Sequence, residues 1–174
     1  VFENVRNLVS ILPENNNEIG GMEECLDDLN RLVPDFAAEV KDPAAALEDL
    51  GDNNFFLELK KDFAKEMVTG FISLDGMTVG CIANRTAVYG EDGSEQESFE
   101  ARLTSDGCDK AASFIKTCDA FNIPVLTLTN VEGFATTVEE EKTIASKAAA
   151  LTAAFAEADV PKVNLITGNA YGSA

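Results

Sequence analysis

The stretch Ile123–Phe134, IPVLTLTNVEGF, joins an apolar strand directly to a glycine turn, and Lys162–Ala174, KVNLITGNAYGSA, repeats this arrangement. We expect the strands themselves at Val125–Thr129 and Lys162–Thr167. Glycine lets a backbone approach a ligand closely, and peptide N–H groups stabilise negative charge without an ionisable side chain. Two such turns at one edge of a sheet therefore predict a binding site for an oxyanion.

One segment with helical periodicity lies before the first of these strands, and another lies between the two. Ser105 is expected to cap a helix whose apolar residues share one face, namely Cys108, Ala111, Ala112, Ile115 and Cys118. Thr137 and Glu140 form a capping-box pattern, which predicts a long helix with an inner face of Ile144, Ala148, Leu151, Phe155 and Ala158. Helices between apolar strands indicate an α/β fold with crossover helices and a mainly parallel sheet, which binds ligands at the carboxyl ends of its strands.

A hairpin is expected before this alternating part. Val68–Leu74 and Met77–Ala83 flank Asp75-Gly76, and an Asp-Gly pair between two β-rich runs is a strong hairpin signal. A short strand is expected at Phe55–Leu59, ahead of the hairpin. The polar segment Val88–Phe99 is expected to form an exposed loop.

The first 52 residues differ in character from the rest of the chain. Val1–Leu12 has the apolar spacing of an amphipathic helix, and the acidic stretch up to Asp52 is rich in turn residues, with short helices expected at Glu23–Leu32 and Pro43–Leu50. Such connectors join globular halves of larger proteins. Because the chain starts at Val1 and stops inside its second glycine turn, we expect it to be a fragment.

The charge of the chain excludes several kinds of partner. The formal net charge is -18, and the 13 basic residues are scattered, whereas nucleic-acid binding needs clustered Lys and Arg. The same sign disfavours anionic membranes, and no apolar run approaches the ~18 residues of a membrane-spanning helix. No signal peptide is visible. We expect a cytoplasmic protein without nucleic-acid binding or membrane insertion.

Cysteine and histidine usage limits the available chemistry. The four cysteines, Cys25, Cys81, Cys108 and Cys118, lack C-x-x-C spacing, and the chain has no histidine, so no metal site is expected. The last three lie among apolar residues and are expected to be buried, reduced thiols. The absence of histidine excludes Ser-His-Asp and Cys-His catalysis by these residues alone.

Several short motifs form a specific set: VTGF at Val68–Phe71, CDAFNIP at Cys118–Pro124, VPKV at Val160–Val163 and AYGSA at Ala170–Ala174. Together they resemble the C-terminal half of biotin-dependent carboxyltransferases, the family of acyl-CoA carboxylase beta subunits and methylmalonyl-CoA decarboxylase alpha subunits. The resemblance implies a crotonase-like (ClpP/crotonase) fold, a superhelix of ββα units. It implies an interdomain helix and acidic connector over residues 1–52, and a carboxyltransferase domain, truncated at its C-terminus, over residues 53–174.

The resemblance also implies an enzymatic function. Such enzymes move CO2 between carboxybiotin and the α-carbon of a short acyl-CoA, such as propionyl-CoA, methylmalonyl-CoA or acetyl-CoA. By resemblance, backbone N–H groups of Gly133, Phe134, Ser173 and Ala174 form an oxyanion hole for the biotin carbonyl, and Gly133, Gly172 and Ser173 contact biotin. The fragment alone is expected to be inactive, because the half that binds acyl-CoA is absent.

The implied partners are a biotin carboxyl carrier protein and either biotin carboxylase or a membrane decarboxylase subunit. The implied assembly is a homo-oligomer, from dimer to hexamer. Two other functions stay open at this point: a biotin-independent crotonase-fold enzyme that works on acyl-CoA, with Glu132 as its acid or base, and a non-catalytic assembly domain.

Some residues of the chain depart from the family pattern or receive no role. Glu132 stands where the family usually has proline, and Glu139–Glu141 lies in place of a glycine-rich segment. Tyr171 is expected to pack, and Asp109 and Lys110 to lie on a solvated helix face. Neither Asp62 nor Lys65 is assigned a catalytic role.

Overall fold

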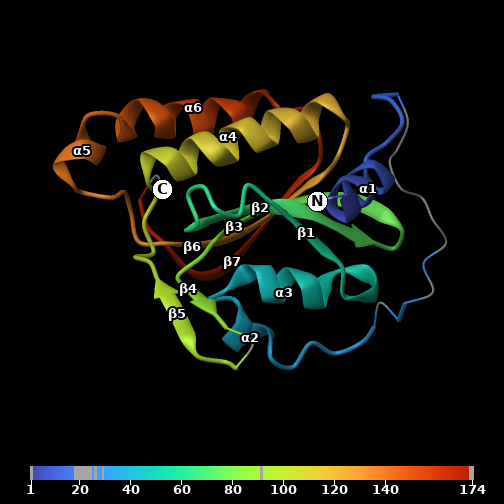
Figure 1. The fold of residues 1–174 in the computed structure, drawn as a ribbon. Coiled ribbons are helices and arrows are strands. Elements are labelled where there is room, and N and C mark those ends of the chain that lie inside the picture. Colours follow the sequence, from blue (N-terminus) through green and yellow to red (C-terminus); the bar gives the residue numbers. More distant parts are fainter. Residues whose placement is uncertain (1, 18–24, 26, 29, 91, 173–174) are drawn as a thin grey trace.

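A central five-stranded sheet organises the molecule in the computed structural model, which describes all residues except 1, 18–24, 26, 29, 91 and 173–174. The strands lie in the order β1 (Phe56–Leu59), β2 (Met67–Leu74), β3 (Met77–Asn84), β6 (Val125–Val131) and β7 (Lys162–Ala170). Helices α4 (Ser105–Ala120) and α6 (Ile144–Glu157) cover one face, and α3 (Pro43–Leu50) lies on the other (Figure 1). The result is a three-layered α/β arrangement.

The strand directions confirm the predicted mainly parallel sheet. Within the described part of the five-stranded sheet, only β2 runs against its neighbours, because it pairs antiparallel with both β1 and β3, whereas β3, β6 and β7 pair in parallel. The carboxyl ends of β3, β6 and β7 therefore meet at one edge, where a parallel sheet usually binds its ligand.

The predicted hairpin is confirmed at β2 and β3. Its turn has positive φ at both Asp75 (53°) and Gly76 (73°), the backbone of a type I′ turn. Strand β2 is buried on both faces: Phe71 packs in the core beneath α4, with its ring centroid 5.1 Å from that of Phe114, while Val68 and Ile72 pack with Leu47 of α3. The hairpin thus links the two apolar cores.

The side chain of Asp52 binds the turn of this hairpin through hydrogen bonds. Its carboxylate, only 4% exposed, accepts hydrogen bonds from Gly76 N at 2.8 Å, Asp75 N at 3.2 Å and Ser73 Oγ at 2.9 Å. Burial alone would raise the pKa of Asp52, but these hydrogen bonds to the charged form outweigh it, so the pKa lies below its usual range.

Asp52→Asn is therefore expected to lower the free energy of unfolding by about 2 kcal/mol at pH 7, because the amide nitrogen cannot accept a hydrogen bond. A carboxyl group whose pKa is lowered by folding stabilises fully above its unfolded pKa of about 3.9 and loses that effect as the pH falls through the folded value. Urea unfolding at pH 7 and at about pH 3 should show the two proteins converging in acid. A difference that is independent of pH would contradict this assignment.

Three of the four cysteines are buried free thiols, as predicted. Burial raises the pKa of Cys108 to about 11 and that of Cys118 to about 12, and it raises the pKa of Cys81 further. Cys25 is half-buried. Within the described ranges, no cluster of three Cys, Asp or Glu residues could hold a metal ion, and no helix is long and apolar enough to span a membrane.

The N-terminal part is tied to the sheet by a buried arginine. Helices α1 (Phe2–Ile11) and α3 both form where the sequence predicts them. Arg85, 6% exposed, places Nε 2.9 Å from Asp42 Oδ1 at the start of α3, and its two terminal nitrogens lie 3.1 and 3.2 Å from the carboxylate oxygens of Glu58 on β1. This guanidinium joins the acidic connector to the sheet.

Two predictions before α4 are wrong. The segment Val88–Phe99 is mostly exposed as expected, but it is not a loop, because it contains most of a hairpin of β4 (Ala87–Tyr89) and β5 (Glu95–Ser98). The described residues of the expected helix Glu23–Leu32 are not helical, and a short helix, α2 (Phe36–Glu39), follows instead. Aspartate side chains accept from nearby backbone N–H groups there, as Asp28 Oδ1 does from Asn30 N at 2.9 Å, and such bonds compete with a helix.

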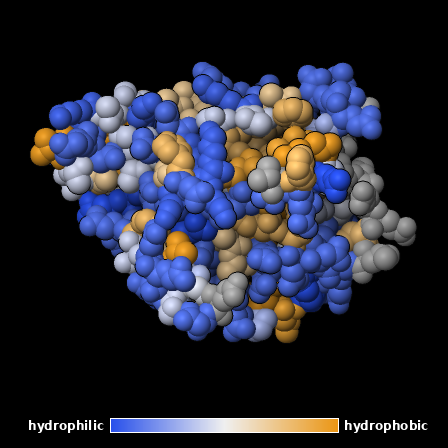
Figure 2. Space-filling model, viewed as in Figure 1, coloured by the Kyte–Doolittle hydropathy of each residue, from blue (hydrophilic) through white to orange (hydrophobic). Residues whose placement is uncertain are grey.

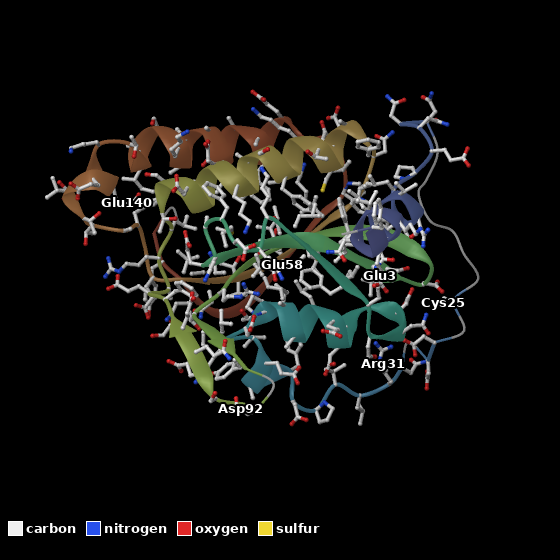
Figure 3. All side chains as sticks on the ribbon, in the orientation of Figure 1. Glu3, Cys25, Arg31, Glu58, Asp92 and Glu140 are labelled. Atoms are coloured by element: carbon white, nitrogen blue, oxygen red, sulfur yellow. The ribbon has the colours of Figure 1, made fainter. Side chains whose placement is uncertain are left out.

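The caps of the two main helices also differ from the prediction. Thr104, not Ser105, caps α4, because its Oγ1 accepts from Gly107 N at 2.9 Å. Thr137 is a cap as predicted, but the long helix is divided into α5 (Val138–Glu141) and α6. Figure 3 shows Glu140 between α5 and the start of α4, where its carboxylate accepts from Ser105 N at 2.7 Å and Ser105 Oγ at 2.6 Å. The predicted capping box is therefore only half formed.

Lys110 is not on a solvated face, although its neighbour Asp109 is. Lys110 is 1% exposed, and its Nζ donates to the carbonyls of Lys60 (2.9 Å), Phe63 (2.7 Å) and Ala64 (3.3 Å). Lys60 and Ala64 both have positive φ. The loop that contains them directs these three carbonyl groups toward the Lys110 amine. Burial lowers the pKa of Lys110 to about 8. The side chain fastens the loop to α4.

Candidate functional site

The two glycine turns follow the neighbouring parallel strands β6 and β7, and they lie at the same height along the sheet. Val131 at the end of β6 pairs with Ala170 at the end of β7, so Gly133 and Gly172 each lie two residues beyond this pair. Their φ values, 135° and 68°, are positive and favour glycine. A Cβ atom added to either glycine would meet no atom of the described residues within 4 Å, so in this part of the chain both turns border open space that a ligand could enter.

The segment before α4 fixes the orientation of the first turn. Leu103 N donates to the Gly133 carbonyl at 2.9 Å, and Ala135 N donates to the Leu103 carbonyl at 2.8 Å. Because a trans peptide directs its C=O and N–H in opposite directions, the N–H of Phe134 points away from Leu103. Among the described residues, neither this N–H nor that of Gly133 has a hydrogen-bond acceptor.

The peptide group between Val131 and Glu132 shows on which side of the chain the Phe134 N–H lies relative to β7. The Val131 carbonyl accepts from Tyr171 N at 3.1 Å, while Glu132 N, in the same peptide, donates to the Ala101 carbonyl at 2.6 Å. The segment 101–103 and strand β7 therefore lie on opposite sides of residues 131–134. The Phe134 N–H, directed away from Leu103, faces the edge on which Tyr171 and Gly172 lie.

The structure brings together only part of the predicted site. Gly133, Phe134 and Gly172 lie at one edge of the sheet, whereas Ser173 and Ala174 lie outside the described residues. Tyr171, expected to pack, is 58% exposed, and its contribution to the site is the backbone bond to Val131.

Four polar side chains lie around the first turn. Arg102 donates from one terminal nitrogen to the Phe134 carbonyl at 3.2 Å, and its Nε lies 3.2 Å from Glu100. Exposed Glu132 accepts from Asn169 Nδ2 at 2.9 Å. Arg102 and Asn169 received no role in the sequence analysis, because their contacts depend on strand register rather than on local sequence.

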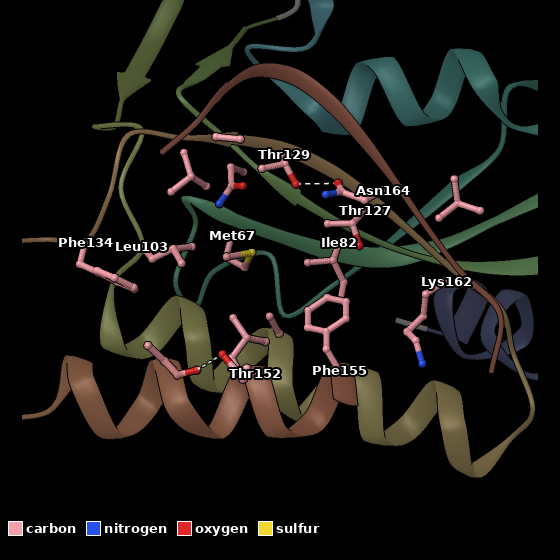
Figure 4. A pocket seen from close by; sticks show the side chains of 17 residues that line it. Met67, Ile82, Leu103, Thr127, Thr129, Phe134, Thr152, Phe155, Lys162 and Asn164 are labelled. Carbon is pink, nitrogen blue, oxygen red and sulfur yellow. Dashed lines mark hydrogen bonds between the residues drawn. The ribbon is translucent and has the colours of Figure 1, made fainter. Parts of the chain in front are cut away.

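A cavity of about 460 Å³ lies between the sheet and α6 and reaches the first turn (Figure 4). Its walls combine apolar side chains such as Leu151 and Phe155 with polar ones, among them Thr129, whose Oγ1 lies 2.7 Å from Asn164 Oδ1. Apolar walls with a few polar groups are typical of small-molecule sites. The alternating threonines of β6, Thr127 and Thr129, are the sequence signal that could have indicated a polar strip on this face.

The face of the molecule seen in the orientation of Figure 1 is mostly polar. The face seen in Figure 2 is largely hydrophilic, with scattered apolar patches, in keeping with the net charge of -18. Glu139–Glu141, the departure from the family pattern, lie in α5, where Glu140 bonds to Ser105. They are thus at the start of α4 rather than on the first glycine turn.

Comparison with known proteins identifies the family. The sequence matches the carboxyl transferase domain over residues 1–174. The chain belongs to the carboxyl transferase family. This carboxyl transferase domain is 38% identical to the propionyl-CoA carboxylase beta chain of Cereibacter sphaeroides, covering 98% of this chain and 33% of the relative. It is also 38% identical to the alpha subunit of methylmalonyl-CoA decarboxylase from Propionigenium modestum, covering 99% of this chain and 33% of that protein.

Solved structures confirm the predicted crotonase-like fold of the carboxyl transferase domain. The transcarboxylase 12S structure, a hexamer assembly with methylmalonyl-coenzyme A and methylmalonic acid bound, matches with a TM-score of 0.76 at 30% identity. The match covers 94% of this chain and 31% of that one. The chain thus spans about a third of the length of the relatives that it matches.

Proposed function

We propose that this domain is the carboxybiotin-binding half of a biotin-dependent acyl-CoA carboxylase or decarboxylase. The enzyme would move CO2 between carboxybiotin and the α-carbon of a short acyl-CoA such as propionyl-CoA, methylmalonyl-CoA or acetyl-CoA. The observation that carries this proposal is the pair of level glycine turns, with the Phe134 N–H facing the second turn and lacking a described acceptor. The names of the relatives, propionyl-CoA carboxylase and methylmalonyl-CoA decarboxylase, support the substrate class.

The residues present fit a ligand with a carbonyl oxygen that gains negative charge. In this proposal the N–H groups of Gly133 and Phe134, with those of Ser173 and Ala174, bind that oxygen, and Gly172 lets the second turn approach it. Biotin, when bound on its carrier protein, supplies the ureido group that carries CO2. The bond from Leu103 orients the Phe134 N–H before the ligand arrives, and such a preorganised donor contributes about 3–4 kcal/mol to transition-state stabilisation.

Partners and domain organisation complete the proposal. We infer a biotin carboxyl carrier protein as partner, with biotin carboxylase or a membrane decarboxylase subunit, in a cytoplasmic homo-oligomer of two to six chains. The hexamer assembly of transcarboxylase 12S supports the upper number. We also infer that residues 1–52 form the interdomain helix and connector, and residues 53–174 the carboxyltransferase domain.

A second function deserves a test because of one observation. Glu132 holds its carboxylate at the first glycine turn through Asn169, where a biotin-independent crotonase-fold enzyme would place an acid or base. That carboxylate is exposed. We favour the biotin-dependent reaction, because backbone donors alone suffice for it.

The test is the decarboxylation of methylmalonyl-CoA and malonyl-CoA by the full-length protein, with and without free biotin. Turnover that requires biotin is the expected result. Turnover without biotin, abolished by Glu132→Gln, would establish the second function instead. Absence of turnover on both substrates, even with a biotinylated carrier protein added, would contradict both enzymatic functions and favour the assembly domain.

A further inference from the structure

Strand β7 contains a bulge just before the second glycine turn. Thr129 of β6 pairs with Ile166, and Val131 pairs with Ala170, so two positions along β6 correspond to four along β7. The additional residues belong to the segment Thr167–Asn169. A β-bulge of this kind shifts the register of everything that follows it.

This shift determines whether the two turns are level. Without the bulge, the register of Thr129 and Ile166 would continue, and Gly133 would lie opposite Ala170 instead of Gly172. Gly172 would then lie about 6.6 Å farther along, since each strand residue advances about 3.3 Å. Donors to one oxyanion must all lie about 3 Å from it, so this displacement would separate the two halves of the proposed site.

Asn130 occupies the inside of the bulge. Its side-chain Oδ1 accepts from Asn169 N at 3.0 Å, and its own backbone N–H lies 3.4 Å from Asn84 Oδ1 on β3. Thr167 Oγ1 donates to the Thr129 carbonyl at 3.3 Å on the other side of the bulge. Hydrogen bonds thus join both ends of the bulge to β6, and the Asn130 side chain accepts the one at the Asn169 end.

The neighbouring glycine gives independent evidence of this close fit. A Cβ atom on Gly168 would lie 2.3 Å from Asn130 Oδ1 and 2.6 Å from its Cγ, far closer than real contacts. Gly168 therefore allows β7 to approach the Asn130 side chain. Asn169 then bonds to Glu132 through its own side chain, which joins the bulge to the residue before Gly133.

We propose that Asn130 is a positioning residue of the oxyanion site, because its side chain holds the β7 bulge that keeps Gly172 level with Gly133. The role rests on the proposed function, since it concerns the backbone donors assigned there. Asn130 acts through the bulge and contacts no reacting atom in this proposal. Its effect should therefore fall on the biotin reaction and leave acyl-CoA binding unchanged.

The experiment compares four variants of the full-length protein: Asn130→Ala, Asn130→Asp, Gly168→Ala and the double variant Asn130→Ala/Gly168→Ala. Three quantities are measured: kcat/KM for free biotin, the Kd of methylmalonyl-CoA by calorimetry, and amide hydrogen exchange of a peptide that covers Val163–Gly172. Exchange reports on the bulge without any turnover.

Asn130→Ala is expected to lower kcat/KM for biotin by about 10- to 100-fold, because misplacement of a catalytic group by 1 Å can cost about 100-fold. Exchange in the peptide should accelerate, and the Kd of methylmalonyl-CoA should stay within about twofold. Asn130→Asp keeps the acceptor for Asn169 N and should restore both exchange protection and most of the activity. Gly168→Ala should be harmful alone but add little to Asn130→Ala, since the clash is with that side chain.

Two results would overturn the positioning role: unchanged kcat/KM and unchanged exchange in Asn130→Ala, or equal losses in Asn130→Ala and Asn130→Asp. A wild-type protein without biotin-dependent turnover would instead overturn the proposed function, and the positioning role with it. In that case the exchange data would still decide whether Asn130 holds the bulge. The two failures are therefore distinguishable.

Discussion

Phe134→Pro is expected to lower kcat/KM for biotin-dependent transfer by about 10²- to 10³-fold in the full-length protein, the loss typical of one missing oxyanion-hole donor. Proline removes the backbone N–H that faces the second glycine turn. The bonds between Leu103 and its partners Gly133 and Ala135 use other atoms, so the turn keeps its outer support.

Phe134→Ala is the matched control for this prediction. Both variants remove the aromatic ring from the cavity wall, but only proline removes the N–H. The alanine variant should therefore stay within about tenfold of the wild type. Steady-state kinetics with free biotin, together with thermal unfolding of each variant, give the comparison. Equal losses in two folded variants would show that the ring, and not the N–H, matters.

Arg85→Met is expected to lower the free energy of unfolding by about 3 kcal/mol, because it leaves the carboxylates of Asp42 and Glu58 without a cation in a mostly buried place. The side chains of these partners are only 13% and 16% exposed. Urea unfolding at neutral pH measures the effect. Neutralising the partners as well, with Asp42→Asn and Glu58→Gln, should recover much of the loss.

Lys65→Met provides the contrasting case. Lys65 pairs with Glu97 at 2.6 Å, a shorter distance than any contact of Arg85 with Asp42 or Glu58, but the side chains of Lys65 and Glu97 are 39% and 43% exposed. Exposed pairs contribute at most about 1 kcal/mol. If both variants lost the same stability, burial would not be the reason for the effect at Arg85.

Much of the fold follows from local patterns. The Asp75-Gly76 pair predicts its hairpin, because few other residue pairs adopt positive φ twice in succession. The apolar runs before Gly133 and Gly172 predict β6 and β7, and hence the two halves of the site. The sequence also places both glycines at carboxyl ends of parallel strands, where the structure has them.

The remaining features depend on contacts between distant residues. Lys110 is buried because carbonyls that lie 46 to 50 positions earlier surround its amine, and no helical pattern reveals them. Strand β5 reads EQES and is exposed throughout, so it lacks the alternation by which a half-buried strand is recognised. The β7 bulge is equally hidden, because the register of parallel strands is decided by side-chain fit across the sheet, as at Asn130 and Gly168.

The parallel pairing of β3, β6 and β7 has a consequence for how this chain folds. The β2–β3 hairpin pairs residues that are close in sequence and can form early. By contrast, Gly80 pairs with Val125, and Val125 with Lys162, only across long connections that contain α4 and α6. The two glycine turns come together only after both of these slow steps. On a ribosome, the hairpin can fold while β7 is still being synthesised, so the pair of level glycine turns is the last feature that this part of the chain forms.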